Sequence, residues 1–223
     1  MKLIFSICTT GMLLAFTACD SELGPPDFDA VAYQPLGTVE GDPKDDFKDG
    51  PDPYEEGEQR LSLGIFYEGG FSDTYEIDNQ NASFFIYSMT FTIEAISECT
   101  EGTYSEEIRH LGRGWFGGGV HFGENQDLSG WETMHLSLWS ESAAMDGLDI
   151  RMKSAEEGMV SASAYGFTAN GEWHHLAIPL ADFEAEGVDL TDIEVALMLI
   201  LEGGAADDAL RIDNVYFTAG ASE

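Results

Sequence analysis

The strongest constraint on the fold is a hydrophobic stretch from Ile193 to Leu201. Ile193 and every second residue after it are apolar, and Ala196, Met198 and Ile200 make the opposite face apolar as well. Strands that are buried on both faces have such nearly continuous apolar sequences. The stretch therefore predicts a central strand covered on both sides, and it restricts the chain to folds with a large packed core.

Two further strand patterns flank this stretch. Trp173–Leu180 alternates apolar and polar residues until Pro179, which cannot donate a sheet hydrogen bond. Leu210–Asp213 alternates apolar and charged residues, and the phase then slips before Val215–Phe217. A β-bulge produces such a slip, so we expect one at Asp213-Asn214.

Turns and short strands recur from Leu61 onward, and no long amphipathic helix interrupts them. The other expected strands are residues 61–67, 83–89, 91–96, 103–110, 115–122, 134–139, 148–152 and 159–167. A glycine triplet, Gly117–Gly119, interrupts one of these strands and allows a bulge or the close approach of another backbone. Short strands with frequent turns are typical of all-β sandwiches, so residues 61–219 are expected to form one such domain.

The first 60 residues have a different character. Lys2 precedes an apolar run that ends in Thr17-Ala18-Cys19 and is too short for a stable membrane span. Small residues directly before a cysteine resemble the lipobox of bacterial lipoproteins. The resemblance implies that residues 1–18 are a signal peptide and that Cys19 is lipidated, which would attach the protein to a membrane of the cell envelope, on its periplasmic or cell-surface face. An ordinary secretory signal with cleavage elsewhere is the alternative.

Residues 19–60 contain six of the seven prolines and many acidic residues. Low hydrophobicity combined with high charge cannot offset the entropy lost on ordering, so we expect an acidic, disordered tether. Its spaced aspartates match no EF-hand calcium loop, and solvated charge is the simpler interpretation.

The charge of the chain excludes several partners. Lys and Arg number 9 against 42 Asp and Glu, which gives a net charge of -33. Nucleic acids require clustered basic residues, and anionic lipid headgroups repel an acidic surface. Adaptation to saline surroundings would also explain the acidity. With Cys8 in the leader and Cys19 lipidated, Cys99 is expected to be an unpaired, partly buried residue rather than part of a disulfide framework.

Several short motifs follow one another in an order that can be compared with known families. D-L-S-G-W begins at Asp127, W-H-x-L-x-I-P-L-x-D-F at Trp173, G-V-D-L-T-x-I at Gly187 and I-D-N-V-Y-F at Ile212. This order resembles galactose-binding-like jelly-roll modules, and most of all the carbohydrate-binding modules of bacterial glycoside hydrolases. The resemblance implies a jelly-roll β-sandwich that binds a glycan or polysaccharide without catalysis, and we expect the protein to be a monomer. A structural or adhesion lipoprotein that binds a protein partner is the alternative.

Residues that could catalyse a reaction follow no known arrangement. The five histidines lack the spacing of a zinc site, and the neighbours His174 and His175 point to opposite faces of a strand. No G-x-S-x-G motif is present in the sequence. Glu101, Glu106 and Glu107 could pair for glycosidic cleavage, but with 42 acidic residues such a pair is expected by chance. We therefore expect that the chain is not an enzyme.

Glycan binding by such a module depends on aromatic rings, because the apolar C–H face of a pyranose stacks on a flat ring. Trp115, Trp139 and Tyr165 are the candidate ligand-binding residues. Trp115 opens the glycine-rich strand, and Trp139 lies opposite the apolar face of its own strand. Each of the three rings is alternatively an ordinary half-buried core residue.

The resemblance also implies a structural calcium ion, which these modules often hold between an aspartate of the last strand and an acidic residue of the first. Asp213 and Glu68 match these positions, and Asp73 is a further candidate ligand. Calcium takes about 6–8 oxygen ligands, and a bulge would free backbone carbonyls to supply some of them. The alternative is that Asp213 caps the bulge by accepting hydrogen bonds from nearby amides.

Overall fold

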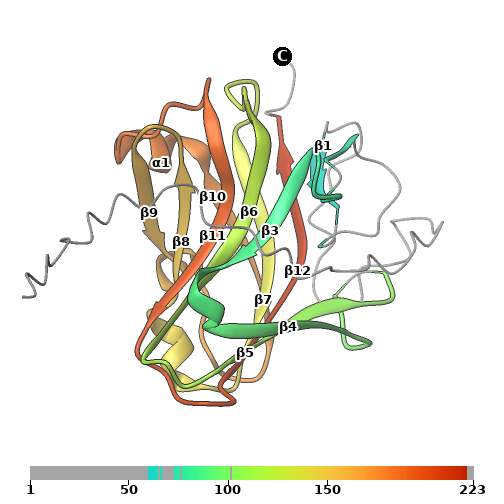
Figure 1. Ribbon diagram of the computed structural model, residues 1–223, viewed down its shortest axis with the longest axis vertical. Coiled ribbons are helices and arrows are strands. Elements are labelled where there is room, and N and C mark those ends of the chain that lie inside the picture. Colours follow the sequence, from blue (N-terminus) through green and yellow to red (C-terminus); the bar gives the residue numbers. More distant parts are fainter. Residues whose placement is uncertain (1–59, 65, 67–72, 76, 101, 220–223) are drawn as a thin grey trace, which may run out of the picture.

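The computed structural model describes residues 60–64, 66, 73–75, 77–100 and 102–219, and they form a β-sandwich of the jelly-roll type (Figure 1). The predicted signal peptide, with Cys19 and residues up to 59 of the predicted tether, lies outside the described residues. Within the described part, no helix is long and apolar enough to cross a membrane.

One sheet has five antiparallel strands in the order β3-β6-β11-β8-β9. The strands are β3 (Ala82–Ile86), β6 (Trp115–Gln126), β11 (Ile193–Glu202), β8 (Asp149–Lys153) and β9 (Glu157–Ser161). β11 lies in the middle of this sheet, as its doubly apolar sequence predicts. Its inner residues, such as Leu197 and Leu199, join the main core, while Met198 and Ile200 face the other side of the sheet.

The second sheet is larger and mixed. Its strands are β10 (Trp173–Pro179), β7 (Thr133–Trp139), β12 (Ala209–Thr218), β1 (Arg60–Leu63), β2 (Asp73–Tyr75), β5 (Ser105–His110) and β4 (Phe91–Ile96). β12 is its organising strand: it pairs with β7 along one edge, and its other edge is shared between β5 and β1. All pairs are antiparallel except β1 with β2.

The exchange of partners along β12 occurs at the predicted bulge. The register with β7 shifts between Asp213 and Tyr216, and Asn214 has a φ of 58°, in the left-handed region. Before the shift β12 pairs with β5, and after it β12 pairs with β1. The phase slip in the sequence thus marks the point where one strand begins to serve a second neighbour.

In the part of the chain that the structure describes, four short helices interrupt the strands. They are η2 (Tyr87–Met89), η3 (Ala143–Gly147), η4 (Ala162–Tyr165) and α1 (Leu180–Ala185), the last lying beside β9 and β10 (Figure 1). Two of them correct predicted strands, because residues 83–89 leave the sheet after Ile86 and residues 159–167 leave it after Ser161. The alternation of Ser and Ala continues beyond Ser161, but these small side chains hold a strand weakly, and Gly166 caps the helical turn with a φ of 96°.

Apolar side chains from the inner faces of both sheets form the main core. Its fully buried members include Phe116, Phe122, Met134, Leu136, Leu138, Ile150, Met152, Leu176, Ile178, Ile212 and Phe217. Burying each such side chain contributes about 1.5–3 kcal/mol. One predicted detail is wrong: Val195 belongs to the cluster on the outer face and Ala196 to the core, because the register of β11 shifts around these residues. Local alternation cannot reveal such a shift.

The glycine triplet of β6 allows neighbouring backbones to come unusually close. A Cβ atom at Gly118 would lie 2.5 Å from the carbonyl oxygen of Phe85 in β3, and one at Gly119 would overlap the carbonyl oxygen of Leu197 in β11. This confirms the expected close approach, and it brings side chains of β3 and β11 together over the middle of β6.

Candidate functional site

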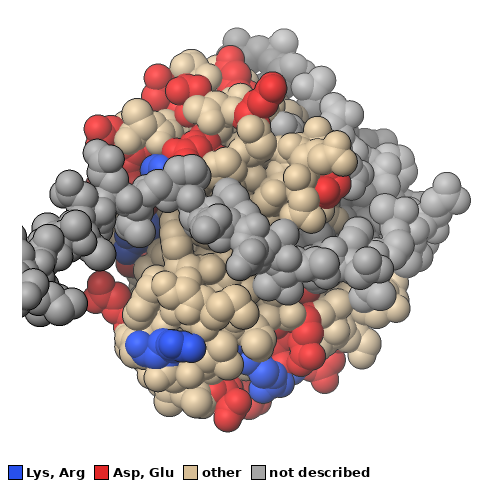
Figure 2. All heavy atoms as spheres, in the orientation of Figure 1, with Lys and Arg blue, Asp and Glu red and all other residues tan. Residues whose placement is uncertain are grey.

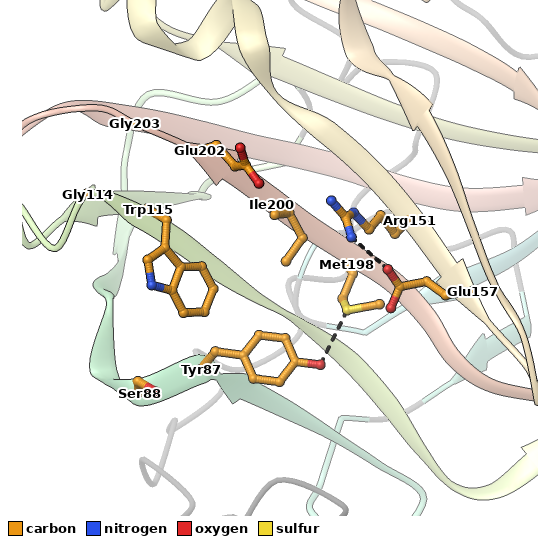
Figure 3. Close-up of a pocket in the computed structure, with 10 residues that line it drawn as sticks. All are labelled: Tyr87, Ser88, Gly114, Trp115, Arg151, Glu157, Met198, Ile200, Glu202 and Gly203. Carbon is orange, nitrogen blue, oxygen red and sulfur yellow. Dashed lines mark hydrogen bonds and ion pairs between the residues drawn. The ribbon is translucent and has the colours of Figure 1, made fainter. Parts of the chain in front are cut away.

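The outer face of the five-stranded sheet carries a hollow of about 670 Å³, which we call the Trp115 hollow (Figure 3). It is lined by Tyr87, Ser88, Gly114, Trp115, Arg151, Glu157, Met198, Ile200, Glu202 and Gly203. These residues come from β6, β8, β9 and β11, from the turn that follows β3, and from the positions just before β6 and just after β11. Four strands of the sheet therefore contribute residues to the hollow directly, and the fifth, β3, contributes through the turn that follows it.

An apolar wall bounds one side of the Trp115 hollow. The rings of Trp115 and Tyr87 lie with their centroids 6.2 Å apart and are tilted by 38°. Figure 3 shows them side by side, with Ile200 and Met198 next to them. The Tyr87 hydroxyl donates to the Met198 sulfur at 3.5 Å, and the Phe85 ring supports Tyr87 from the side at 4.9 Å. The Tyr87 ring is thus held at both ends.

A charged pair lies across the hollow from the two rings (Figure 3). Arg151 donates through Nη1 to Glu157 Oε1 at 2.7 Å and through Nη2 to Asp149 Oδ2 at 3.3 Å. The Arg151 Nε atom is buried and has no hydrogen-bond partner among the described residues. The planar guanidinium is therefore fixed in direction, while it and Glu157 still offer donors and an acceptor toward the hollow.

The electrostatics of the hollow keep the tyrosine neutral. Burial, and then the carboxylates of Glu157 and Glu194, raise the pKa of Tyr87. Its phenol therefore remains protonated well above neutral pH. The hollow thus combines an uncharged aromatic wall with an opposing acid–base pair, which suits a ligand that has one apolar face and several hydroxyl groups.

Of the three predicted ligand-binding aromatics, Trp115 alone lines this hollow. Trp139 ends β7 in the other sheet, where the Arg211 guanidinium lies 3.8 Å above the centre of its ring. Its Nε1 donates to the carbonyl oxygen of Gly171 at 2.8 Å. A second hollow of about 390 Å³, bordered by Trp139 and by charged residues such as Arg109 and Glu107, lies there. One face of the Trp139 ring is therefore covered by a cation.

Tyr165 lies in a third place, in the helical turn η4 after β9. Its hydroxyl donates to Asp182 Oδ2 at 2.6 Å, and its ring packs against the main core. Burial and the Asp182 carboxylate raise the pKa of Tyr165 to about 12. The structure therefore does not bring the three predicted aromatics together.

Several residues of the Trp115 hollow were not identified from the sequence, namely Tyr87, Arg151, Glu157, Met198 and Ile200. A signal existed for one of them: Arg151 lies on the outward-facing side of a strand whose alternate residues, Ile150 and Met152, are apolar and buried. For Tyr87 no signal was present, because its segment has the composition of a continuing strand.

The structure places one of the two predicted calcium ligands. Asp213 is 2% exposed, its Oδ2 accepts hydrogen bonds from the backbone N and the Oγ1 of Thr100 at 2.7 and 2.8 Å, and its Oδ1 accepts from Asn214 N at 2.9 Å. These bonds are those of a residue that caps the bulge. Glu68 lies outside the described residues, and Asp73 is in β2. Among the described residues, no group of three or more His, Cys, Asp and Glu side chains is arranged to hold a metal. Calcium at this position stays a prediction.

The histidines of β10 diverge as expected. His174 Nε2 lies 2.9 Å from Asn170 Oδ1, whereas the His175 ring faces the opposite way and stacks against His135 of β7. His135 Nδ1 and His175 Nε2 are 3.2 Å apart, a pairing across strands that the sequence does not reveal. Glu107, one of the acidic residues considered for catalysis, forms ion pairs with Arg109 and Arg211.

Comparisons with solved structures give distant similarities. The family 11 carbohydrate-binding module of the Clostridium thermocellum cellulosomal cellulase Lic26A-Cel5E is 14% identical, with 64% of this chain and 90% of that chain covered and a TM-score of 0.48. The same organism's family 11 module in complex with a β-1,3-1,4-mixed-linked tetrasaccharide is 14% identical over 64% and 91%, with a TM-score of 0.47. The family 30 module of its cellulase Cel9D-Cel44B is 16% identical over 62% and 87%, with a TM-score of 0.46.

No curated protein matches the chain. A family model does: the model of carbohydrate binding domain 30 matches residues 63–219, which include every described strand except the start of β1. The match covers more than half of the sequence and coincides with the β-sandwich that carries the Trp115 hollow. This chain belongs to the carbohydrate binding domain 30 family.

Proposed function

We propose that the Trp115 hollow binds a glycan chain without cleaving it. The observation that carries this proposal is the pairing, across one hollow, of an aromatic wall with a fixed guanidinium and carboxylate, in a member of a carbohydrate-binding family. The apolar face of a pyranose would stack on Trp115 and Tyr87. Its hydroxyls would exchange hydrogen bonds with Arg151 and Glu157.

The charges around the hollow favour an uncharged glycan. Glu157 and Glu202 line the hollow, and Arg151 is already paired with Asp149 and Glu157. On the face drawn in Figure 2, acidic patches outnumber basic ones on the described surface. A polysaccharide with carboxylate or sulfate groups would be repelled by such a surface, whereas a neutral chain would not.

We also propose that the protein displays this site as a lipoprotein of the cell envelope. The support is the sequence Thr17-Ala18-Cys19 after a short apolar run, followed by the acidic, proline-rich residues up to 60. A tether of this composition would hold the β-sandwich away from the membrane surface. The alternative, a role in adhesion, would require an extended apolar patch on the surface. The large apolar side chains that are exposed in the described part, against which this requirement can be judged, are those of Met89, Leu111 and Met159.

The test is a comparison of two tryptophans. Glycan binding is measured by titration calorimetry and affinity electrophoresis with a panel of soluble neutral polysaccharides that includes β-1,3-1,4-glucan. We expect Trp115→Ala to weaken binding about ten-fold or more, which corresponds to ~1.4 kcal/mol, because the stacking surface is lost. Trp139→Ala is the matched control, since this ring lies in the other sheet beneath Arg211. A folded Trp115→Ala protein that binds as the wild type does would contradict the proposal.

A further inference from the structure

We propose that Thr90 is a positioning residue of the glycan site. Its buried hydroxyl would hold the turn Tyr87–Met89 against Gly117 of β6 and thereby fix the Tyr87 ring beside Trp115. The expected effect of Thr90 on binding rests on the proposed function. The positioning of the Tyr87 ring by Thr90, in contrast, is a property of the protein without ligand.

The turn that carries Tyr87 has an unfavourable backbone. Ser88 has a φ of 49° and Met89 a φ of 50°, so two consecutive residues with side chains adopt the left-handed region. Such residues avoid this region because Cβ approaches the following carbonyl oxygen. A conformation of this kind persists only where surrounding contacts impose it, and it is enriched at ligand-binding positions. The contacts that impose it here come from the next residue, Thr90.

Thr90 connects three segments of the chain. It is 1% exposed, and its backbone N donates to Tyr87 O at 3.1 Å, which closes the turn. Its carbonyl oxygen accepts from Leu111 N at 2.9 Å, and its Oγ1 accepts from Gly117 N at 3.1 Å. The ladder between β3 and β6 ends with the pair Ile86 and Gly118. Gly117, the neighbouring residue of β6, therefore has no partner in β3, and its N–H donates to the Thr90 hydroxyl instead.

Gly117 is also the point at which the wall of the hollow is assembled. A Cβ atom there would lie 2.6 Å from Ile200 Cδ1, 2.8 Å from Trp115 Cζ3 and 3.1 Å from Tyr87 Cδ2. Three side chains that line the hollow therefore meet directly over this glycine. A hydrogen bond from its backbone to the turn fixes the position of Tyr87 relative to the surface on which Trp115 rests.

Replacing the hydroxyl while keeping the shape isolates this bond. In Thr90→Val, the Gly117 N–H is left buried without its acceptor, and the turn loses its side-chain attachment to β6 while it keeps the backbone bond from residue 90 to Tyr87 O. We expect the affinity for a β-1,3-1,4-glucan oligosaccharide to fall roughly 3- to 10-fold, because a site that is no longer preorganised has to be ordered on binding. Thr90→Ser keeps the hydroxyl and should bind within about two-fold of the wild type.

A readout without ligand separates positioning from general damage. The indole N–H signal of Trp115, assigned by its loss in Trp115→Phe, reports the ring's surroundings in the free protein by NMR. We expect Thr90→Val to shift this signal and Thr90→Ser to leave it in place. Thr100→Val is the matched control, because Thr100 is also 1% exposed and its hydroxyl donates to Asp213 in the other sheet. It should lower the melting temperature without shifting the Trp115 signal or changing the affinity.

Two results would overturn the inference: an unchanged Trp115 signal with unchanged affinity in Thr90→Val, or the same changes in Thr100→Val. If Thr90→Val does not fold, Thr90→Ala is measured instead, since it leaves room for a water to reach the Gly117 N–H and the same displacement is expected. If the wild type binds no glycan, the proposed function fails, and the Trp115 signal still decides whether Thr90 positions the ring.

Discussion

On the outer face of the larger sheet, the rings of His135, Tyr216 and His175 form a cluster in which each ring stacks against the other two. The centroids of His135 and Tyr216 are 4.6 Å apart with an angle of 4° between the planes, and those of His135 and His175 are 5.4 Å apart. His175 Nδ1 also lies 3.3 Å from Ser137 Oγ. Burial lowers the pKa of His175 to about 4. The folded protein therefore holds this imidazole in its neutral form across the range in which a free histidine becomes charged.

This residue predicts a specific loss of stability in acid. The unfolded chain takes up a proton at His175 near pH 6.5, whereas the folded protein does so only near pH 4. Stability from the neutral ring is therefore complete above about pH 6.5 and declines as the pH falls toward 4. The full loss amounts to roughly 3.5 kcal/mol, since the two pKa values differ by about 2.5 and a difference of one corresponds to about 1.4 kcal/mol. Urea unfolding of the wild type and of His175→Gln at pH 7, 6, 5 and 4.5 measures it.

His175→Gln is the control for other titrating groups, because the wild type and the variant have the same carboxylates, which titrate in the same pH range. The free energy of unfolding of His175→Gln should fall less steeply between pH 6.5 and 4.5 than that of the wild type. Equal slopes would show that the proton uptake of His175 does not differ between the folded and unfolded states.

Trp139 shows what the alternation of apolar and polar residues in a strand can predict about a single side chain and what it cannot. Alternation correctly predicts that Trp139 points away from the core of β7, since Met134, Leu136 and Leu138 are fully buried. It does not predict that Arg211 covers the ring, because Arg211 is the neighbour of Trp139 only through the register of β12 with β7. Pairing between strands that lie about 70 residues apart is set by the whole sheet and not by either segment.

Among the elements, β12 pairs with β5 before its bulge and with β1 after it, and the bulge also binds a third segment. Asp213 accepts hydrogen bonds from both the backbone and the side chain of Thr100, which lies in the connection between β4 and β5. The bulge was predictable because it shifts the phase of an alternating pattern. The hollow on the other sheet was only partly predictable, since the segment Phe84–Met89 contains no glycine or proline to mark the turn that carries Tyr87.

Calcium binding at this bulge remains our prediction, supported by the resemblance to calcium-holding modules and by the position of Asp213 at the shift in register. An ion that binds the folded state alone stabilises it by about 2.7 kcal/mol at 100 times its dissociation constant. Chelation should therefore lower the melting temperature by about 5–10 °C, and millimolar calcium should restore it. Magnesium should restore it poorly, because it demands a tighter octahedral geometry.

Two controls separate a specific site from the screening of a highly acidic protein. Sodium chloride at matched ionic strength measures general screening. Asp213→Ala should be less stable in any buffer, since Thr100 and Asn214 lose their acceptor, so its response to calcium is the quantity to compare. A variant that gains as much from calcium as the wild type would place the ion elsewhere or exclude it.

At the scale of the whole molecule, charge and attachment are connected. A chain with a net charge of -33 gains nothing from anionic lipid headgroups, so membrane attachment would have to come from covalent lipid. One acyl chain gives only marginal binding, whereas several give stable anchoring, which is the outcome that lipidation of Cys19 implies. The acidic segment before the β-sandwich would also keep the glycan site away from a negatively charged surface.

The resulting prediction concerns Cys19 and compares it with a second cysteine of the leader. In cells that process bacterial lipoproteins, a palmitate analogue should label the wild type, and the protein should sediment with membranes and enter a detergent phase. Cys19→Ala should lose the label and its membrane association, because no other feature of an acidic β-sandwich replaces the hydrophobic energy of the acyl chains, ~0.8 kcal/mol for each buried CH₂. Cys8→Ala should behave as the wild type, since Cys8 lies in the segment expected to be removed. Equal labelling of the wild type and Cys19→Ala would contradict lipidation of Cys19 and would favour the alternative, an ordinary secretory signal with cleavage elsewhere.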